Sequence, residues 1–136
     1  MKKFGAIDVL VNNAGYASAG LFEGTELSEI QNQFDVNLFG VMRVTKAVLP
    51  TMRAQKNGTI VNISSVIGSI SASAWSTYAA SKWALEGWAE SLSFELLPFN
   101  IQVKIVQPGG FKTEVFNTLT MSTKDDVPEY KAIADA

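Results

Sequence analysis

Three short apolar runs alternate with two long helical patterns, and this alternation limits the fold more than any other feature of the chain. The apolar runs cover residues 7–11, 59–63 and 101–106, which have the length and composition of buried strands. Hydrophobic residues at steps of three and four predict a helix over residues 28–55, and a second helix is expected over residues 76–97. Strands that alternate with helices pair in parallel through right-handed crossovers. The sequence therefore predicts an α/β fold with a parallel sheet of about three strands and flanking helices.

The boundaries of these elements carry local signals. Ser28 followed by Gln31 matches a capping box and predicts where the first helix begins. Asn57-Gly58 predicts a turn after that helix, and Pro98 ends the second helix. Each apolar run ends in a polar or glycine-rich turn, at the edge of the sheet where open α/β folds gather their ligands.

Composition excludes several kinds of chemistry. Among the 136 residues there is no cysteine and no histidine, which excludes disulfides, thiolate zinc sites and cysteine nucleophiles and removes the commonest metal ligand. Acid–base chemistry then falls to Tyr, Lys, Asp or Glu, and we expect no metal site. The net charge of −2 and the scattered basic residues argue against nucleic acid as a partner.

The chain is expected to form a single domain over residues 1–136, with residues 114–136 as an uncertain tail or substrate loop. No apolar run approaches the roughly 20 residues needed to span a bilayer, so no membrane contact is expected. Met1-Lys2-Lys3 imitates the start of a secretory signal, but Asp8 and Asn12 interrupt the apolar stretch. A cytoplasmic location is the expectation.

Candidate chemistry centres on Tyr78, which stands four residues before Lys82 and thirteen residues after Ser65. Tyrosine ionises near pH 10, so it needs help to act at neutral pH, and a lysine one helical turn away favours the phenolate. A serine hydroxyl from a strand end would hold the oxygen atom that the tyrosine protonates. Taken alone, Tyr78 and Lys82 also fit a buried aromatic residue followed by a solvated lysine.

Four motifs in order and spacing resemble the short-chain dehydrogenase/reductase family. They are Asn12-Asn13-Ala14-Gly15, Asn37 within Asp35-Val36-Asn37, Ser65 with Tyr78-x-x-x-Lys82, and Pro108-Gly109 with Thr113. The resemblance implies a Rossmann-like sheet and hydride transfer between NAD or NADP and a small-molecule alcohol or ketone. It also implies a homo-oligomer assembled through the two long helices.

The resemblance assigns a role to each catalytic candidate. Tyr78 would donate or accept the substrate proton, and Lys82 would lower the pKa of Tyr78 and bind the nicotinamide ribose. Ser65 would orient the substrate oxygen. Asn37 would hold a water that links Lys82 to bulk solvent, although a buried amide satisfied by backbone groups is the alternative.

The same resemblance implies a set of cofactor contacts. The turn after the first strand would approach the adenosine ribose, and the turn after the third strand would lie against the nicotinamide, with Thr113 at its amide or the phosphates. The residues concerned are Asn12, Ala14, Gly15, Tyr78, Lys82, Pro108, Gly109 and Thr113. Either turn alone also fits a plain connection between elements.

The chain departs from the family pattern in one respect, because the glycine-rich T-G-x-x-x-G-x-G turn is absent from it. It resembles the catalytic middle of the family, and the strand over residues 7–11 would form an apolar sheet edge. Two functions therefore remain open: an oxidoreductase, or a truncated non-catalytic remnant that acts as an assembly or dimerisation module. Ile67, Ile70, Trp75, Phe111 and Phe116 near the expected pocket mouth favour an apolar substrate.

Overall fold

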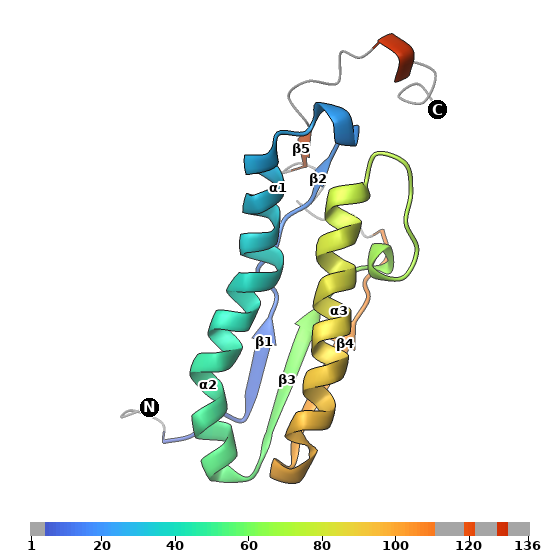
Figure 1. Ribbon diagram of the computed structural model, residues 1–136. Helices are drawn as coiled ribbons and strands as arrows, with labels where there is room; N and C mark the ends of the chain where they lie inside the picture. Colours follow the sequence, from blue (N-terminus) through green and yellow to red (C-terminus); the bar gives the residue numbers. More distant parts are fainter. Residues whose placement is uncertain (1–4, 111–118, 122–127, 131–136) are drawn as a thin grey trace.

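The computed structural model describes residues 5–110, 119–121 and 128–130. Its centre is a three-stranded sheet in the order β1–β3–β4, formed by Val9–Asn12, Gly58–Ile63 and Ile101–Val106. Both pairings are parallel, with Asn12 opposite Asn62 and Ile63 opposite Val106. The predicted α/β fold with a parallel sheet is confirmed. In Figure 1 the long helices lie in front of one face of this sheet.

The helix predicted over residues 28–55 is not one continuous α-helix in the structure. It divides into α1 (Leu27–Phe34), a π-helical segment (Asp35–Gly40) and α2 (Val41–Gln55). The prediction of one regular helix over 28–55 is therefore wrong in its middle. A π-helical segment adds residues to a turn and changes the direction of the side chains on it.

Both predicted boundaries of this segment also need correction. Helix α1 begins at Leu27 because Glu26 and Glu29 form a reciprocal capping box, in place of the predicted pair Ser28 and Gln31. At the other end Lys56 adopts the left-handed conformation (φ 53°), while Gly58 is already the first, buried residue of β3.

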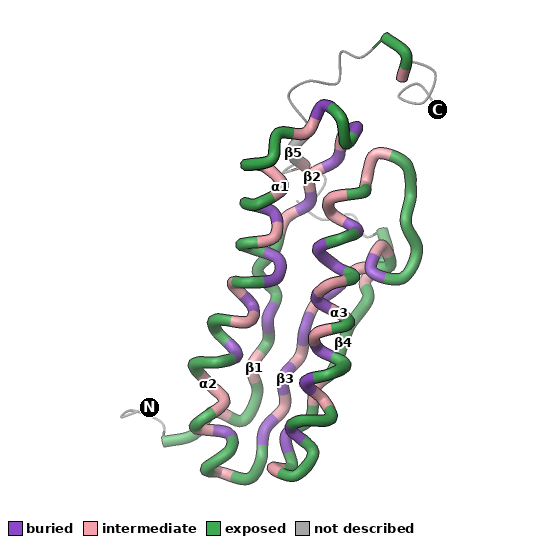
Figure 2. Tube along the Cα trace, viewed as in Figure 1, coloured by how far each residue is buried: buried purple, intermediate pink, exposed green. Residues whose placement is uncertain are grey.

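Helix α3 spans Ser76–Leu96 and continues into a short 3-10 turn at Leu97–Phe99, with Pro98 inside that turn. The predicted helix over 76–97 is confirmed to within one residue. Its apolar residues meet those of α2 and the sheet in two adjoining clusters, and Trp88 packs against both. Their buried members are Met52, Ile60, Leu92, Leu96 and Ile101 in one cluster and Leu38, Val41 and Leu85 in the other. Figure 2 shows buried positions interspersed with exposed and intermediate ones along the helices, whereas along β3 buried positions alternate with intermediate ones.

A second, smaller sheet was not predicted. Strand β2 (Ser18–Ala19) pairs in parallel with β5 (Thr120–Met121) beyond the end of β1. Nearby, the Tyr130 hydroxyl donates to a Glu23 carboxylate oxygen at 3.1 Å. Parts of the predicted tail thus contact the segment that follows β1, and the division into a single domain stays a prediction.

Strand β1 forms one edge of the main sheet in the part of the chain that the structure describes, since it pairs only with β3. Val9 and Val11 are 57% and 54% exposed, as expected for an apolar edge. Within the described ranges, no helix is both long and apolar enough to cross a bilayer.

Met52 gives a direct test of the core. Its side chain is fully buried, so we expect Met52→Ala to lower the free energy of unfolding by about 2–5 kcal/mol. Urea denaturation followed by circular dichroism measures this change. The control is Arg53→Ala on the exposed side of the same helix, which should cost less than about 1 kcal/mol. Equal losses in the two variants would contradict the described packing.

Candidate active site

Tyr78 and Ser65 come together at the carboxyl end of β3. Tyr78 lies in the first turn of α3, and Ser65 begins the 3-10 turn Val66–Gly68 that follows the strand. The Ser65 side chain lies near enough to the Tyr78 phenol to lower its pKa. The Ser65 oxygen also accepts from the Ile67 backbone N–H at 3.2 Å, so the hydroxyl is held in place from its own turn. The structure therefore joins the two groups that the sequence placed thirteen residues apart.

Lys82 lies one turn after Tyr78 and is 6% exposed. Its Nζ donates to the Ile63 carbonyl at 2.9 Å, at the last residue of β3. The same nitrogen lies 5.8 Å from the centroid of the Tyr78 ring. The lysine is thus buried beside the tyrosine, and the alternative of a solvated lysine is excluded.

The pKa values of the pair shift in ways that burial explains. Burial raises the pKa of Tyr78, and the hydrogen bond from Ser65 offsets part of the rise. Burial lowers the pKa of Lys82 to about 8, against the opposing charge of Glu86. The net pKa of Tyr78 is therefore raised, because desolvation of the phenol dominates, and the expected lowering of this pKa by Lys82 stays a prediction.

Asn37 lies in the π-helical segment and is 1% exposed. Its oxygen accepts from the Tyr16 N–H at 3.1 Å, and its nitrogen donates to the Tyr16 carbonyl at 3.0 Å and to the Ser81 hydroxyl at 3.1 Å. Ser81 in turn donates to the Tyr78 carbonyl at 2.7 Å. Asn37 therefore ties the turn after β1 to the first turns of α3. These contacts match the alternative of a buried, satisfied amide, and the water relay stays a prediction.

Gln33 is a contributor that the sequence reasoning missed. It is fully buried one turn before Asn37 and donates to the Tyr16 carbonyl at 2.7 Å. Its oxygen accepts from the Ser18 N–H at 3.3 Å and from the Ser18 hydroxyl. The spacing of two amides four residues apart, on the face that carries Phe34 and Leu38, was the available signal.

In the segment at the end of β1, one predicted cofactor residue is buried and hydrogen-bonded, whereas two others are exposed. Asn12 is buried, and its amide donates to the Thr45 hydroxyl at 3.1 Å and to the Asn62 oxygen at 2.8 Å. Its side chain is therefore used to join β1 to β3 and α2. Ala14 and Gly15 lie exposed in the turn.

Gly15 allows a close approach at the site. A Cβ at this position would lie 3.1 Å from the Asn37 oxygen and 3.7 Å from the Lys82 Nζ. The absence of a side chain at Gly15 therefore lets the turn after β1 lie close to Asn37 and to the Lys82 ammonium.

The turn after β4 closes the site on its other side. The Pro108 carbonyl accepts from the Val66 N–H at 3.1 Å, which joins this turn to the one that carries Ser65. Gly109 is exposed, and a Cβ there would meet nothing within 4 Å. Thr113 lies outside the described residues, so its predicted cofactor contact stays a prediction.

A comparison with family models matches residues 1–124 to the short chain dehydrogenase family. The chain belongs to this family. The match includes every residue of the site just described, and it accounts for the parallel sheet with the polar strand ends on one side.

Relatives of this chain include human retinol dehydrogenase 8, which is 52% identical over 110 residues, 81% of this chain and 35% of the relative. A short-chain dehydrogenase from Streptomyces avermitilis superposes with a TM-score of 0.85 at 43% identity, over 95% of this chain and 48% of that one. Gluconate 5-dehydrogenase from Burkholderia cenocepacia, solved with NADP and tartrate, superposes with a TM-score of 0.81 at 30% identity, over 99% of this chain and 48% of that one. The chain thus spans less than half the length of these relatives.

The low pKa of Lys82 predicts a dependence of stability on pH. Between pH 8 and about 10.5 the unfolded lysine keeps its proton while the folded lysine has lost it, so unfolding takes up a proton. The free energy of unfolding should therefore rise with pH across this window, through the Lys82 contribution.

Comparison with Lys82→Met isolates that contribution, since the variant keeps a long, unbranched side chain and carries no charge. The difference in unfolding free energy between the two proteins, measured by urea denaturation at several pH values, should move in favour of the unmodified chain from pH 8 to 10.5. A difference that stays constant across the window would contradict the buried, weakly basic lysine.

Proposed function

We propose that this chain carries the acid–base site of an NAD(P)-dependent oxidoreductase that interconverts an alcohol and a ketone. The supporting observation is that the Ser65 hydroxyl acts on the Tyr78 phenol beside the buried Lys82. A tyrosine that can release or take up a proton, next to a hydroxyl that can hold the same substrate oxygen, matches the reversible conversion of C–OH to C=O.

Each side chain has one task in this proposal. Tyr78 donates its proton to the substrate oxygen during reduction and accepts it during oxidation. Ser65 donates a hydrogen bond to that oxygen and stabilises the negative charge that develops on it. When it is protonated, Lys82 places a positive charge beside Tyr78. Because its pKa is about 8, Lys82 can gain or lose a proton near neutral pH. Asn37 keeps the turn after β1 in place beside Lys82.

The nicotinamide cofactor would supply or accept the hydride. Lys82 and the open backbone at Gly15 are the groups that would hold its ribose, and the turn at Pro108 and Gly109 would lie against the nicotinamide. The related gluconate 5-dehydrogenase was solved with NADP, which supports this class of cofactor without deciding between NAD and NADP. The contact of Thr113 with the nicotinamide amide or the phosphates belongs to the same proposal.

The expected substrate is an apolar alcohol or ketone. Trp75 packs edge-on against Tyr78 with ring centroids 5.7 Å apart, and Ile70 is 72% exposed in the loop between them and Ser65. The relative named retinol dehydrogenase 8 is named for an apolar alcohol. Phe111 and Phe116, which the sequence placed at the same mouth, lie outside the described residues.

Removal of the phenol tests the mechanism. Tyr78→Phe should lower turnover of apolar alcohols by about 10²- to 10⁴-fold, because the proton donor is lost, while fluorescence titration still detects NADPH or NADH. The matched control is Tyr16→Phe, since Asn37 contacts the backbone of Tyr16. Turnover that survives Tyr78→Phe would refute the proposed role, and absence of binding up to millimolar cofactor would refute the enzymatic function for this chain.

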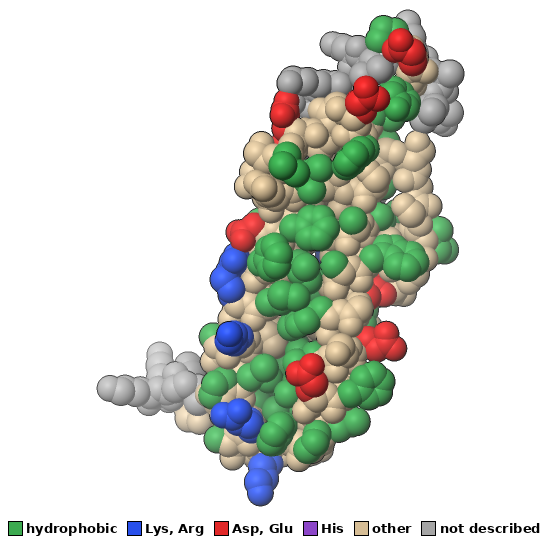
Figure 3. Space-filling model, viewed as in Figure 1, with side chains coloured by type: hydrophobic (Ala, Val, Ile, Leu, Met, Phe, Trp, Pro, Cys, Tyr) green, Lys and Arg blue, Asp and Glu red, His purple; other side chains and the backbone are tan. Residues whose placement is uncertain are grey.

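A non-catalytic assembly module is the second candidate, and a surface feature supports the assembly part of it. Hydrophobic side chains gather on the helical face between the α1–α2 segment and α3 (Figure 3). Within the α1–α2 segment, the large hydrophobic residues Val36, Phe39 and Val44 are exposed at 39%, 47% and 48%. Apolar surface of this kind marks a protein contact. We propose that this face joins two copies of the chain, whether or not the chain is active; the cytoplasmic location stays a prediction.

A charge placed on this face tests the assembly. Phe39→Glu combined with Val44→Glu should convert an oligomer into monomers, because two desolvated carboxylates would oppose their symmetry mates. Light scattering after gel filtration gives the mass directly. The control is Val9→Glu on the edge strand β1, which should leave the mass unchanged. A monomeric unmodified chain at high micromolar concentration would contradict the proposal.

A further inference from the structure

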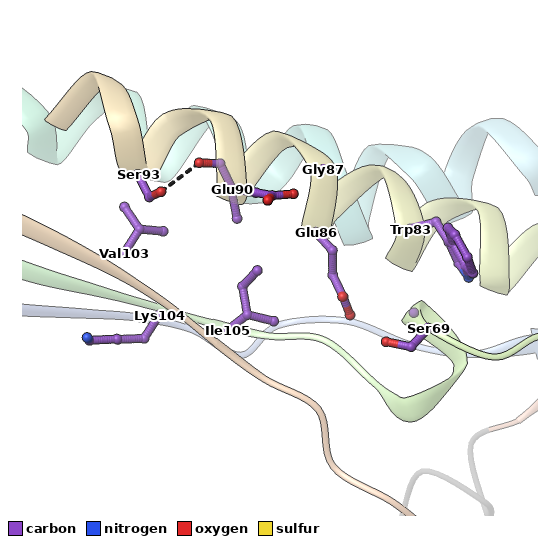
Figure 4. Close-up of a pocket in the computed structure, with 11 residues that line it drawn as sticks. Ser69, Trp83, Glu86, Gly87, Glu90, Ser93, Val103, Lys104 and Ile105 are labelled. Atoms are coloured by element: carbon purple, nitrogen blue, oxygen red, sulfur yellow. Dashed lines mark hydrogen bonds between the residues drawn. The ribbon is translucent and has the colours of Figure 1, made fainter. Parts of the chain in front are cut away.

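Glu86 forms the centre of a polar cluster behind the site. The Ser64 hydroxyl donates to one of its carboxylate oxygens, and the Gln107 amide donates to both oxygens at 2.9 and 2.7 Å. The same amide also donates to the Ser69 hydroxyl. In Figure 4 the Glu86 side chain points from α3 towards the turn that carries Ser69. One carboxylate therefore receives donors from two strand ends.

The turn after β3 is fitted closely to this carboxylate. A Cβ on Gly68 would lie 2.1 Å from the Glu86 oxygen and 2.7 Å from the Ser64 hydroxyl, so only glycine is compatible with the contact. Ser64 is 4% exposed, and Glu86 is half-buried. Removal of the carboxylate would leave a buried hydroxyl without its acceptor, which is costly.

The elements that meet at Glu86 are those that carry the proposed site. Ser64 directly precedes Ser65, and Gln107 directly precedes Pro108. Glu86 itself lies one helical turn after Lys82 and two turns after Tyr78. The distance between the Ser65 hydroxyl and the Tyr78 phenol depends on how α3 sits against the end of β3, and the Glu86 bonds act across that junction.

A ligand site in the adjoining hollow is the competing interpretation. This hollow of about 690 Å³ lies between α3 and β4 and is lined by Glu86, Glu90 and Lys104 among others. Glu90 lies exposed one turn further along α3. The carboxylate of Glu86, in contrast, is already occupied by the Ser64 and Gln107 donors, which favours an internal role.

We propose that Glu86 is a positioning residue, whose carboxylate holds the ends of β3 and β4 against α3 and so fixes Ser65 relative to Tyr78. This inference rests on the proposed function for its catalytic consequence. Its structural part stands separately, because it concerns the geometry of the turn after β3.

Trp83 provides a readout that needs no activity. Its indole N–H donates to the Ile67 carbonyl at 3.0 Å, within the turn that Glu86 contacts. In a ¹H–¹⁵N spectrum of the chain, the indole signal of Trp83 is assigned by its disappearance in Trp83→Phe. We expect Glu86→Ala to shift this signal and to speed its hydrogen exchange, whereas Glu90→Gln on the next turn leaves both unchanged.

Exchanging the residues at positions 86 and 107 distinguishes the loss of their hydrogen bonds from the loss of a side chain. Glu86→Gln alone places an amide opposite the Gln107 amide, so the pairing of donor and acceptor is lost. Glu86→Gln combined with Gln107→Glu restores a carboxylate opposite an amide and should return the Trp83 signal to its original position. If Glu86→Ala does not fold, Glu86→Gln and the exchanged pair decide the question on their own.

The kinetic consequence is a loss in kcat. Because a small displacement of reacting groups is costly, Glu86→Ala or Glu86→Gln should lower kcat by about 10- to 100-fold with little change in KM for the cofactor, and the exchanged pair should recover most of it. An unshifted Trp83 signal in the single variants, or an exchanged pair that restores neither signal nor kcat, would overturn the positioning role. Failure of the proposed function would instead appear as absence of turnover in the unmodified chain, with the Trp83 result unaffected.

Discussion

The bond from the Lys82 ammonium to the Ile63 carbonyl is the contact on which the site depends. It joins the second turn of α3 to the last residue of β3, and it is the polar compensation for burying a lysine at 6% exposure. A hydrogen bond from a charged donor contributes more than a neutral one, about 1.5–3 kcal/mol. The price of burial is still visible in the lowered pKa of Lys82. This bond fixes the position of α3 along β3, and in this position Tyr78 lies beside Ser65.

Polar side chains around this bond act mainly on the backbone of neighbouring turns. Gln33 and Asn37 bind the Tyr16 carbonyl, and Asn37 also binds the Tyr16 N–H. Asn12 joins β1 to Asn62 on β3. Such bonds satisfy buried groups that have no partner in regular secondary structure, and they make the turns rigid. Rigid turns suit a site in which two hydroxyl groups must reach the same substrate oxygen.

The strands, the helical regions and the group of Tyr78, Ser65 and Lys82 could be predicted because each has a signal in local spacing. Apolar runs and helical periodicity report which residues are buried, and a tyrosine and lysine four residues apart share a helix face by geometry alone. The π-helical segment had no such signal, since Asp35–Gly40 continues the hydrophobic steps of a regular helix. The direction of the Tyr78 pKa shift was also beyond the sequence, because it depends on how much water the fold removes.

Glu86 shows a further limit of local reading. In the sequence it is an acidic residue on a long helix, and its partners Ser64 and Gln107 lie 22 and 21 residues away. Only the parallel order β1–β3–β4 brings both strand ends to the same turn of α3. Gly68 completes the argument, since its missing side chain is explained by the carboxylate that occupies the space. The positioning role of Glu86 is therefore recognised from the residues around it as well as from its own carboxylate. Here Gly68 has no Cβ, and the Ser64 hydroxyl has no acceptor other than Glu86 among the bonds described.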